Sequence, residues 1–93
     1  MTLTELLENG ATIVDVRTEA EFMGGNVTNS INIPLNEVPE RVSEFKAIEG
    51  PIVLCCLSGG RSGQATAFLQ AQGVECYNSG GWMDVNHAVG QVS

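Results

Sequence analysis

The segment best equipped for chemistry is CLSGGRS at positions 56–62, in which a thiol is followed by small residues and a guanidinium. A cysteine attacks as its thiolate, and a helix N-terminus or a nearby cation can lower a thiol pKa from about 8.5 to between ~3.5 and ~7.5. A helix predicted to begin at Ser62 would direct its positive end at the sulfur, and Arg61 would add a charge. These features predict a nucleophilic thiolate at Cys56.

The same loop offers donors for an anion. Gly59 and Gly60 can adopt backbone conformations closed to other residues, so successive N–H groups can form an anion-binding nest. Ser58 and Ser62 add hydroxyl donors, and Ser62 is also predicted to be the N-cap of the following helix. Such a cradle would suit the anionic outer sulfur of a persulfide. The residues predicted to bind substrate are Leu57, Ser58, Gly59, Gly60, Arg61 and Ser62.

Alternating strands and helices are predicted to position this loop. Strands are expected at 11–16, 30–33, 52–56 and 74–77. Helices are expected at 4–9, 19–23, 35–48, 62–72 and 82–89, the third with a break near Pro39, and a turn is expected at Gly80-Gly81. Such alternation implies an α/β fold, a single domain over residues 1–93 with a central parallel sheet of four to five strands and helices on both faces. Ligands of such sheets lie at the carboxyl ends of the strands, where the loop is placed.

Composition and charge exclude several classes of protein. The 93 residues carry 11 acids against 4 bases, a net charge of −7, so no basic face is available for nucleic acid. Three cysteines make no disulfide framework, and no His or Cys pair has metal-binding spacing. No apolar run reaches the ~18 residues of a membrane span, and the N-terminus lacks the pattern of a signal peptide. We expect a cytoplasmic protein without a cofactor, a metal or a membrane partner.

Short motifs recur in a characteristic order along nearly the whole chain. They are DVR at 15–17, EF at 21–22, GNV at 25–27, INIP at 31–34, IVLC at 52–55, the loop CLSGGRS, LQAQGV at 69–74 and SGGW at 79–82. The ordered set resembles the single-domain rhodanese-like (thiosulfate sulfurtransferase) family. The family usually has a histidine where this chain has Asn26, and its first strand is not evident in the short N-terminal segment.

The resemblance implies a sulfurtransferase reaction. Cys56 would take a sulfane sulfur from a small anionic donor such as thiosulfate, hold it as a persulfide, and pass it to a thiophilic acceptor such as cyanide or a thiol. Polysulfide, a low-molecular-weight persulfide or a protein sulfur donor is equally compatible with a loop that has one cation. A non-catalytic sulfur carrier or binding module is a further alternative.

The adjacent Cys55 creates a second register. Counting from Cys55 gives Cys-x5-Arg, the spacing of cysteine phosphatases and of rhodanese-fold arsenate reductases, whose longer loop surrounds a tetrahedral oxyanion. Ala65 fits the sulfurtransferase pattern, and Leu54 stands where phosphatases of this spacing commonly have a histidine. Both features favour Cys56 as the nucleophile, with Cys55 as a small buried apolar residue.

The remaining reactive side chains are expected to serve the structure. Asp15 and Arg17 are predicted to make buried polar contacts that hold neighbouring loops. Cys76 is expected in the core, and His87 on the surface or in packing. Trp82 is expected to be a hydrophobic plug after the glycine turn, with the mouth of the pocket as its alternative place.

Overall fold

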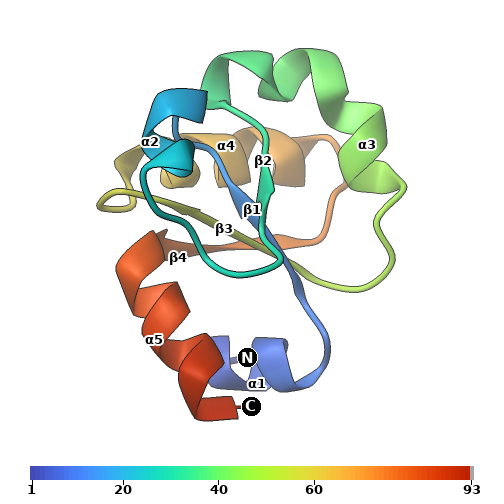
Figure 1. The fold of residues 1–93 in the computed structure, drawn as a ribbon. Helices are drawn as coiled ribbons and strands as arrows, with labels where there is room; N and C mark the ends of the chain where they lie inside the picture. The colour runs from blue at the N-terminus through green and yellow to red at the C-terminus, as the bar shows by residue number, and fades with distance from the viewer. Residues whose placement is uncertain (93) are drawn as a thin grey trace.

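The centre of the fold is a parallel sheet of four strands in the order β2-β1-β3-β4 (Figure 1). The computed structural model describes residues 1–92. The strands are β1 (Thr12–Asp15), β2 (Ile31–Asn32), β3 (Ile52–Cys56) and β4 (Cys76–Gly81). The expected α/β domain with a parallel sheet of four to five strands is thereby confirmed.

Helices cover both faces of the sheet, as the alternating pattern predicts. The helices are α1 (Leu3–Glu8), α2 (Glu19–Met23), α3 (Val42–Lys46), α4 (Gly60–Ala71) and α5 (Trp82–Val92), with a 3-10 helix η1 (Leu35–Arg41). On one face η1, α3 and α4 bury Val38, Phe45 and Leu69 against the strands. On the other face α1 and α5 bury Leu6 and Val85, and these two helices lie together at the lower side in Figure 1. Within residues 1–92, no helix has the length and apolar character that crossing a bilayer requires.

Strand β3 is the best buried element, because all five of its residues are inaccessible to solvent. It pairs with β1 on one side and β4 on the other. A continuous apolar run is the pattern expected of a parallel strand covered on both faces. Because the strands are parallel, the carboxyl ends of β1 and β3 meet at one edge, and Cys56 is the last residue of β3 there.

Helix α4 begins two residues earlier than predicted, at Gly60 instead of Ser62. Gly59 occupies the N-cap position with φ 105°, so the prediction of Ser62 as the N-cap is wrong. The backbone turns from strand to helix at a glycine that tolerates this left-handed conformation. Ser62 therefore lies inside the first helical turn, where it is fully buried.

The bounds of β4 and of the segment that contains η1 and α3 also differ from those predicted. The expected turn at Gly80-Gly81 is wrong, since β4 runs from Cys76 through Gly81, and Gly81 pairs with Cys56 across an irregular register. The helix expected over 35–48 with a break near Pro39 is divided into η1 and α3, and Pro39 lies inside η1. Proline lacks the N–H that a continuous α-helix would need at that position.

Candidate active site

Cys56 lies at the point where β3 passes into the helix α4. Loop residues 57–59 separate the end of the strand from the first residue of the helix. Cys56 is only 1% exposed, so its sulfur lies at the floor of this loop. The strand-to-helix passage places the thiol at the N-terminal end of a 12-residue helix, where the helix dipole favours negative charge.

The sulfur of Cys56 receives backbone N–H donors from its own loop and helix. The Gly59 N–H donates to Sγ at 3.0 Å, and the Ser62 N–H lies 3.5 Å from Sγ. The Ser62 Oγ lies 3.4 Å from the same sulfur. The sulfur thus lies in a cradle of donors from Gly59 and Ser62, whereas Gly60 and the Ser58 hydroxyl, which the sequence also predicts as donors, are not among these contacts.

The cradle changes the acidity of the Cys56 thiol. Burial opposes ionisation and is the largest single influence, but hydrogen bonds from the Ser62 hydroxyl and from the amides of Ser62, Gly59 and Ser58 outweigh it and lower the pKa of Cys56 to about 7. Donors to the charged form of an acid stabilise that form. The cradle therefore favours the thiolate form of Cys56 near neutral pH.

Alkylation of Cys56 is expected to report this pKa. Below pH 7 the thiol is protonated and reacts slowly; the rate should rise through a midpoint near pH 7 and level off above pH 8, because only the thiolate attacks. The measurement is the rate of iodoacetamide addition to the native protein, followed by peptide mass spectrometry. A midpoint near pH 9 would contradict the cradle described above.

The Ser62 hydroxyl is shared between the sulfur and Asn78 of β4. Ser62 Oγ donates to Asn78 Oδ1 at 2.6 Å, a shorter contact than its 3.4 Å approach to Cys56 Sγ. A hydroxyl carries one proton, so it serves one of these acceptors at a time. The backbone N–H groups of Gly59 and Ser62 take no part in the contact with Asn78, so their contacts with the sulfur do not depend on the direction of the hydroxyl proton.

Asn78 also ties the loop to the end of β4. Its Nδ2 donates to the Gly59 carbonyl at 3.2 Å, and its Oδ1 accepts from the Gly80 N–H at 3.1 Å. One amide side chain therefore holds the left-handed turn, the first turn of α4 and the strand end together. Asn78 was not predicted as a site residue, and its place immediately before SGGW is its one local signal in the sequence.

Close backbone packing requires glycine at a second position. A Cβ placed on Gly81 would lie 2.9 Å from the Leu57 carbonyl oxygen, closer than such atoms approach one another. Gly81 thereby allows β4 to pass directly beside the loop. Gly60, in contrast, begins the helix, so only Gly59 of the two loop glycines uses the backbone freedom that the sequence analysis expected of both.

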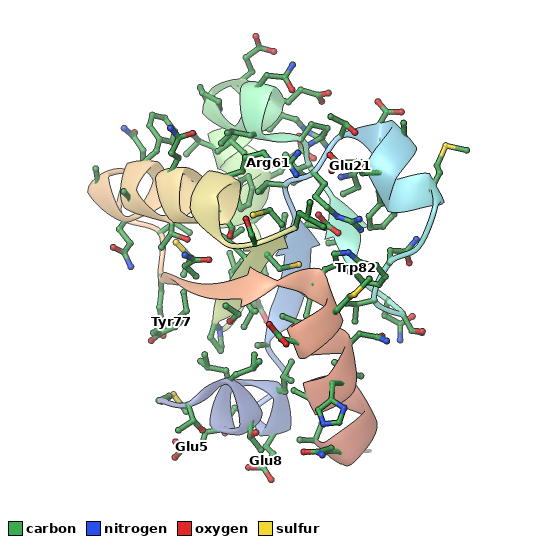
Figure 2. The ribbon with its side chains drawn as sticks, turned by 90° about the vertical axis from the view of Figure 1, so that its left-hand side faces the viewer. Glu5, Glu8, Glu21, Arg61, Tyr77 and Trp82 are labelled. Atoms are coloured by element: carbon green, nitrogen blue, oxygen red, sulfur yellow. The ribbon has the colours of Figure 1, made fainter. Side chains whose placement is uncertain are left out.

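Arg61, predicted to face the reacting anion, is engaged by a carboxylate from another helix. Its Nη1 and Nη2 donate to Glu21 Oε1 and Oε2 of α2 at 2.7 and 3.0 Å. Figure 2 shows the two side chains facing each other between α4 and α2. Glu21 belongs to the EF motif but was not predicted as a site residue, because nothing in its neighbourhood signals a partner 40 residues away.

Asp15 and Arg17 make the buried polar contacts that the sequence predicts, and the structure shows that they pair with each other. Arg17 Nη2 lies 2.7 Å from Asp15 Oδ2, and both side chains are almost fully buried. Arg17 also donates to the Gly25 carbonyl at 2.7 Å and lies over the Trp82 ring at 4.7 Å. This cluster joins the end of β1 to the loop after α2 and to the start of α5, so the structural role expected for Asp15 and Arg17 is confirmed.

Cys55 lies on the other face of the sheet from Cys56. Neighbouring residues of a strand point to opposite faces. Cys56 packs with the η1, α3 and α4 core, whereas Cys55 packs with Leu6, Val27 and Val85. Burial, with a smaller contribution from Asp15, raises the pKa of Cys55 to about 12. The buried position expected for Cys55 is confirmed, and its thiol does not face the loop that the Cys-x5-Arg register requires.

The other predicted residues lie as follows. Leu57 and Ser58 are exposed on the outside of the loop. Cys76 is buried and Trp82 packs partly against the α1 and α5 core, as expected. His87 is exposed and contacts Gln91, which confirms its surface position.

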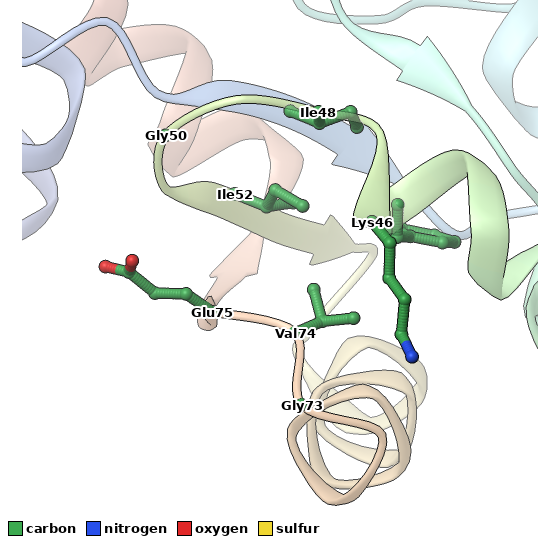
Figure 3. A pocket seen from close by; sticks show the side chains of 8 residues that line it. Lys46, Ile48, Gly50, Ile52, Gly73, Val74 and Glu75 are labelled. Carbon is green, nitrogen blue, oxygen red and sulfur yellow. The ribbon is translucent and has the colours of Figure 1, made fainter.

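A separate cavity of about 240 Å³ lies at the amino end of β3, and Cys56 lies at the carboxyl end of the same strand. It is lined by residues that include Lys46, Ile52, Val74 and Glu75 (Figure 3). Ile52 is the first residue of β3, whereas Cys56 is the last, so the cavity and the thiol are at opposite ends of the strand. No thiol or hydroxyl is among the residues lining this cavity, so Cys56 remains the candidate centre.

Comparisons with known proteins point to one family. A family profile described as rhodanese-like domain matches residues 2–88. A protein from Staphylococcus saprophyticus, SSP1007, superposes with a TM-score of 0.77 at 35% identity, covering 97% of this chain and 94% of that one. The likeness therefore extends through sequence and fold alike.

Two bacterial relatives have names that state an activity. A sulfurtransferase from Allochromatium vinosum is 39% identical over 61 residues, which are 66% of this chain and 56% of the relative. The thiosulfate sulfurtransferase PspE of Escherichia coli is 35% identical over 74 residues, 77% of this chain and 71% of that protein. The chain spans only about half the length of several relatives that it matches, the Allochromatium vinosum protein among them.

Proposed function

The chain belongs to the rhodanese-like domain family, and from that premise we propose that it is a sulfurtransferase that carries sulfane sulfur as a persulfide on Cys56. The observation that carries the proposal is the placement of Cys56 Sγ at the N-terminal end of α4, with the Gly59 and Ser62 amides directed at it. A thiol with a pKa of about 7 is nucleophilic at neutral pH without a separate base. Sulfurtransferase relatives are consistent with this chemistry.

The proposed first half-reaction loads the cysteine. The Cys56 thiolate attacks the outer sulfur of the donor and forms a bond from Sγ to that sulfur. The bond between this sulfur and the rest of the donor breaks, and its electron pair leaves with sulfite when thiosulfate is the donor. When a protonated thiol persulfide is the donor, the electron pair leaves with its thiolate, which then takes the proton that the transferred outer sulfur carried. The product is an anionic Cys56 persulfide beside amide donors that favour negative charge.

The proposed second half-reaction returns the cysteine to its starting state. A cyanide or thiolate acceptor attacks the outer sulfur, and the bond from that sulfur to Sγ breaks. Sγ leaves as the thiolate, which the same cradle stabilises. The low pKa of Cys56 thus favours both its attack and its departure.

The test is mass mapping of the protein after exposure to thiosulfate, polysulfide and cysteine persulfide in separate samples. Cys56 should gain the mass of one sulfur atom with at least one donor, and cyanide or a thiol should remove it. Addition of sulfur at Cys55 or Cys76, or at no cysteine, would contradict the proposal. Hydrolysis of a phosphate ester that Cys55→Ala abolishes and Cys56→Ser leaves intact would instead support the phosphatase register.

A sulfur carrier is the second candidate, and the near-complete burial of Cys56 favours it. A buried persulfide is protected from solvent and is released only to a partner that reaches the loop floor. Steady turnover of thiosulfate with cyanide supports the enzyme, whereas a single loading from a protein donor without turnover supports the carrier.

A further inference from the structure

The positive charge of Arg61 in the loop is neutralised by the carboxylate of Glu21, which belongs to helix α2. Arg61 is the only cation of the loop 56–62, and its two terminal nitrogens are bound by the two oxygens of Glu21. An arginine and a carboxylate in this paired geometry form a charge-assisted, bidentate contact. An incoming anion at the loop therefore meets a neutral pair in place of a free guanidinium.

Glu21 is held in this position from its own side. Its Oε1 accepts from the Thr18 N–H and the Thr18 hydroxyl, both at 3.1 Å, and the Thr18 Oγ1 accepts from the Glu21 N–H at 3.2 Å. These contacts make a capping box at the start of α2. Arg17 donates to the Glu21 carbonyl at 3.3 Å and so attaches the same residue to the buried cluster. The carboxylate is thus part of a fixed arrangement, unlike most surface ion pairs.

The ionisation of Glu21 is stable across the working range of the site. Hydrogen bonds from Arg61, and next from the Thr18 backbone, lower the pKa of Glu21 to about 2. The carboxylate remains negative wherever the Cys56 thiolate exists. The pair therefore keeps the same charge during the reaction.

The other lysine and arginine side chains do not replace Arg61 as a free cation for an anionic donor. Arg17 is paired with Asp15, and Arg41 is paired with Glu37 and Glu44 on η1 and α3. Lys46 lines the cavity at the amino end of β3, away from the thiol (Figure 3). With a net charge of −7, the whole chain also repels anions at long range.

We infer that Glu21 is a specificity-determining residue, which disfavours a dianionic sulfur donor such as thiosulfate and directs the site toward a thiol persulfide. The inference rests on the proposed function, because it concerns the donor of the Cys56 half-reaction. The two donors deliver the same sulfur but differ in the group left behind: sulfite from thiosulfate, a thiol from the persulfide. A sulfonate-like head needs cationic or N–H partners, whereas the thiol remainder of a persulfide does not.

The experiment compares two donors in three proteins. The probes are thiosulfate, a dianion, and cysteine persulfide, whose ammonium and carboxylate charges cancel and which carries at most the single negative charge of its outer sulfur. The measured quantity is the second-order rate constant for sulfur addition to Cys56, followed by intact mass. The variants are Glu21→Gln, which retains the hydrogen-bonding shape of the capping box while removing the charge, and Glu19→Gln, which removes an exposed charge from the first turn of the same helix.

The ratio of the two rate constants is the readout. Wild type should favour cysteine persulfide, and Glu21→Gln should raise the thiosulfate-to-persulfide ratio roughly fivefold, while Glu19→Gln leaves it near the wild-type value. An unchanged ratio in Glu21→Gln, or an equal rise in Glu19→Gln, would overturn the inference. Failure of both donors to load wild-type Cys56 would overturn the proposed function itself, and the inference with it.

Discussion

Replacing Cys56 with serine is expected to abolish sulfur loading, with a fall of at least about 10³-fold in the rate constant for every donor. The hydroxyl of serine cannot be ionised at neutral pH by a cradle that lowers a thiol to a pKa of about 7. The amides of Gly59 and Ser62 would still be present, so donor affinity can persist while chemistry stops. Mass mapping after donor exposure measures this loss directly.

The matched control for this variant is Cys55→Ala. Cys55 is equally buried and adjacent in sequence, but its side chain packs on the opposite face of the sheet. Its removal should lower stability by about 1 kcal/mol while leaving the loading of Cys56 in place. Sulfur loading that survives in Cys56→Ser and disappears in Cys55→Ala would show that Cys55, and not Cys56, is the nucleophile.

The second large effect is expected on stability, from Asp15→Asn. This change keeps the shape of the side chain but removes the negative charge that faces Arg17, which is 3% exposed. An arginine left buried without its counterion costs roughly 3–5 kcal/mol. A domain of this size is stable by only about 5–15 kcal/mol, so the variant should lose a large part of its free energy of unfolding. Urea denaturation measures the loss.

An exposed ion pair supplies the comparison. Glu44 pairs with Arg41 at 2.6 Å, but its side chain is 52% exposed. Glu44→Gln should change the free energy of unfolding by about 0.5 kcal/mol or less, because water replaces the lost partner. If Asp15→Asn were as mild as Glu44→Gln, the buried cluster around Arg17 would not hold the site as described.

The Arg17 cluster and the Cys56 loop are connected through Glu21. Arg17 binds the backbone carbonyl of Glu21, and the Glu21 carboxylate binds Arg61 on the first turn of α4. The buried ion pair at the end of β1 therefore sets the position of the side chain that neutralises the loop cation. Stability and the proposed donor preference would then depend on one set of contacts, although Asp15 and Cys56 belong to different strands.

The sequence was sufficient for the strand at 52–56 and for the order of strands and helices, which depend on local patterns. The continuous apolar run at 52–56 predicts a buried strand, and all five residues are buried. The alternation of strands and helices predicts the parallel sheet, and the parallel sheet places the end of β3 at the ligand edge. These predictions succeed because burial and backbone period are properties of short segments.

Only the tertiary structure decided the partners of the site residues. Asn78 contacts Ser62 over 16 residues of chain, and Glu21 contacts Arg61 over 40. The start of α4 at Gly60 was likewise set by the left-handed turn at Gly59, which Asn78 of β4 holds. Such pairs of polar side chains come into contact only when their elements pack together, so no periodic pattern in a short stretch of sequence indicates them. The sequence therefore predicted the candidate thiol and its loop, while packing determined how the loop cation is neutralised.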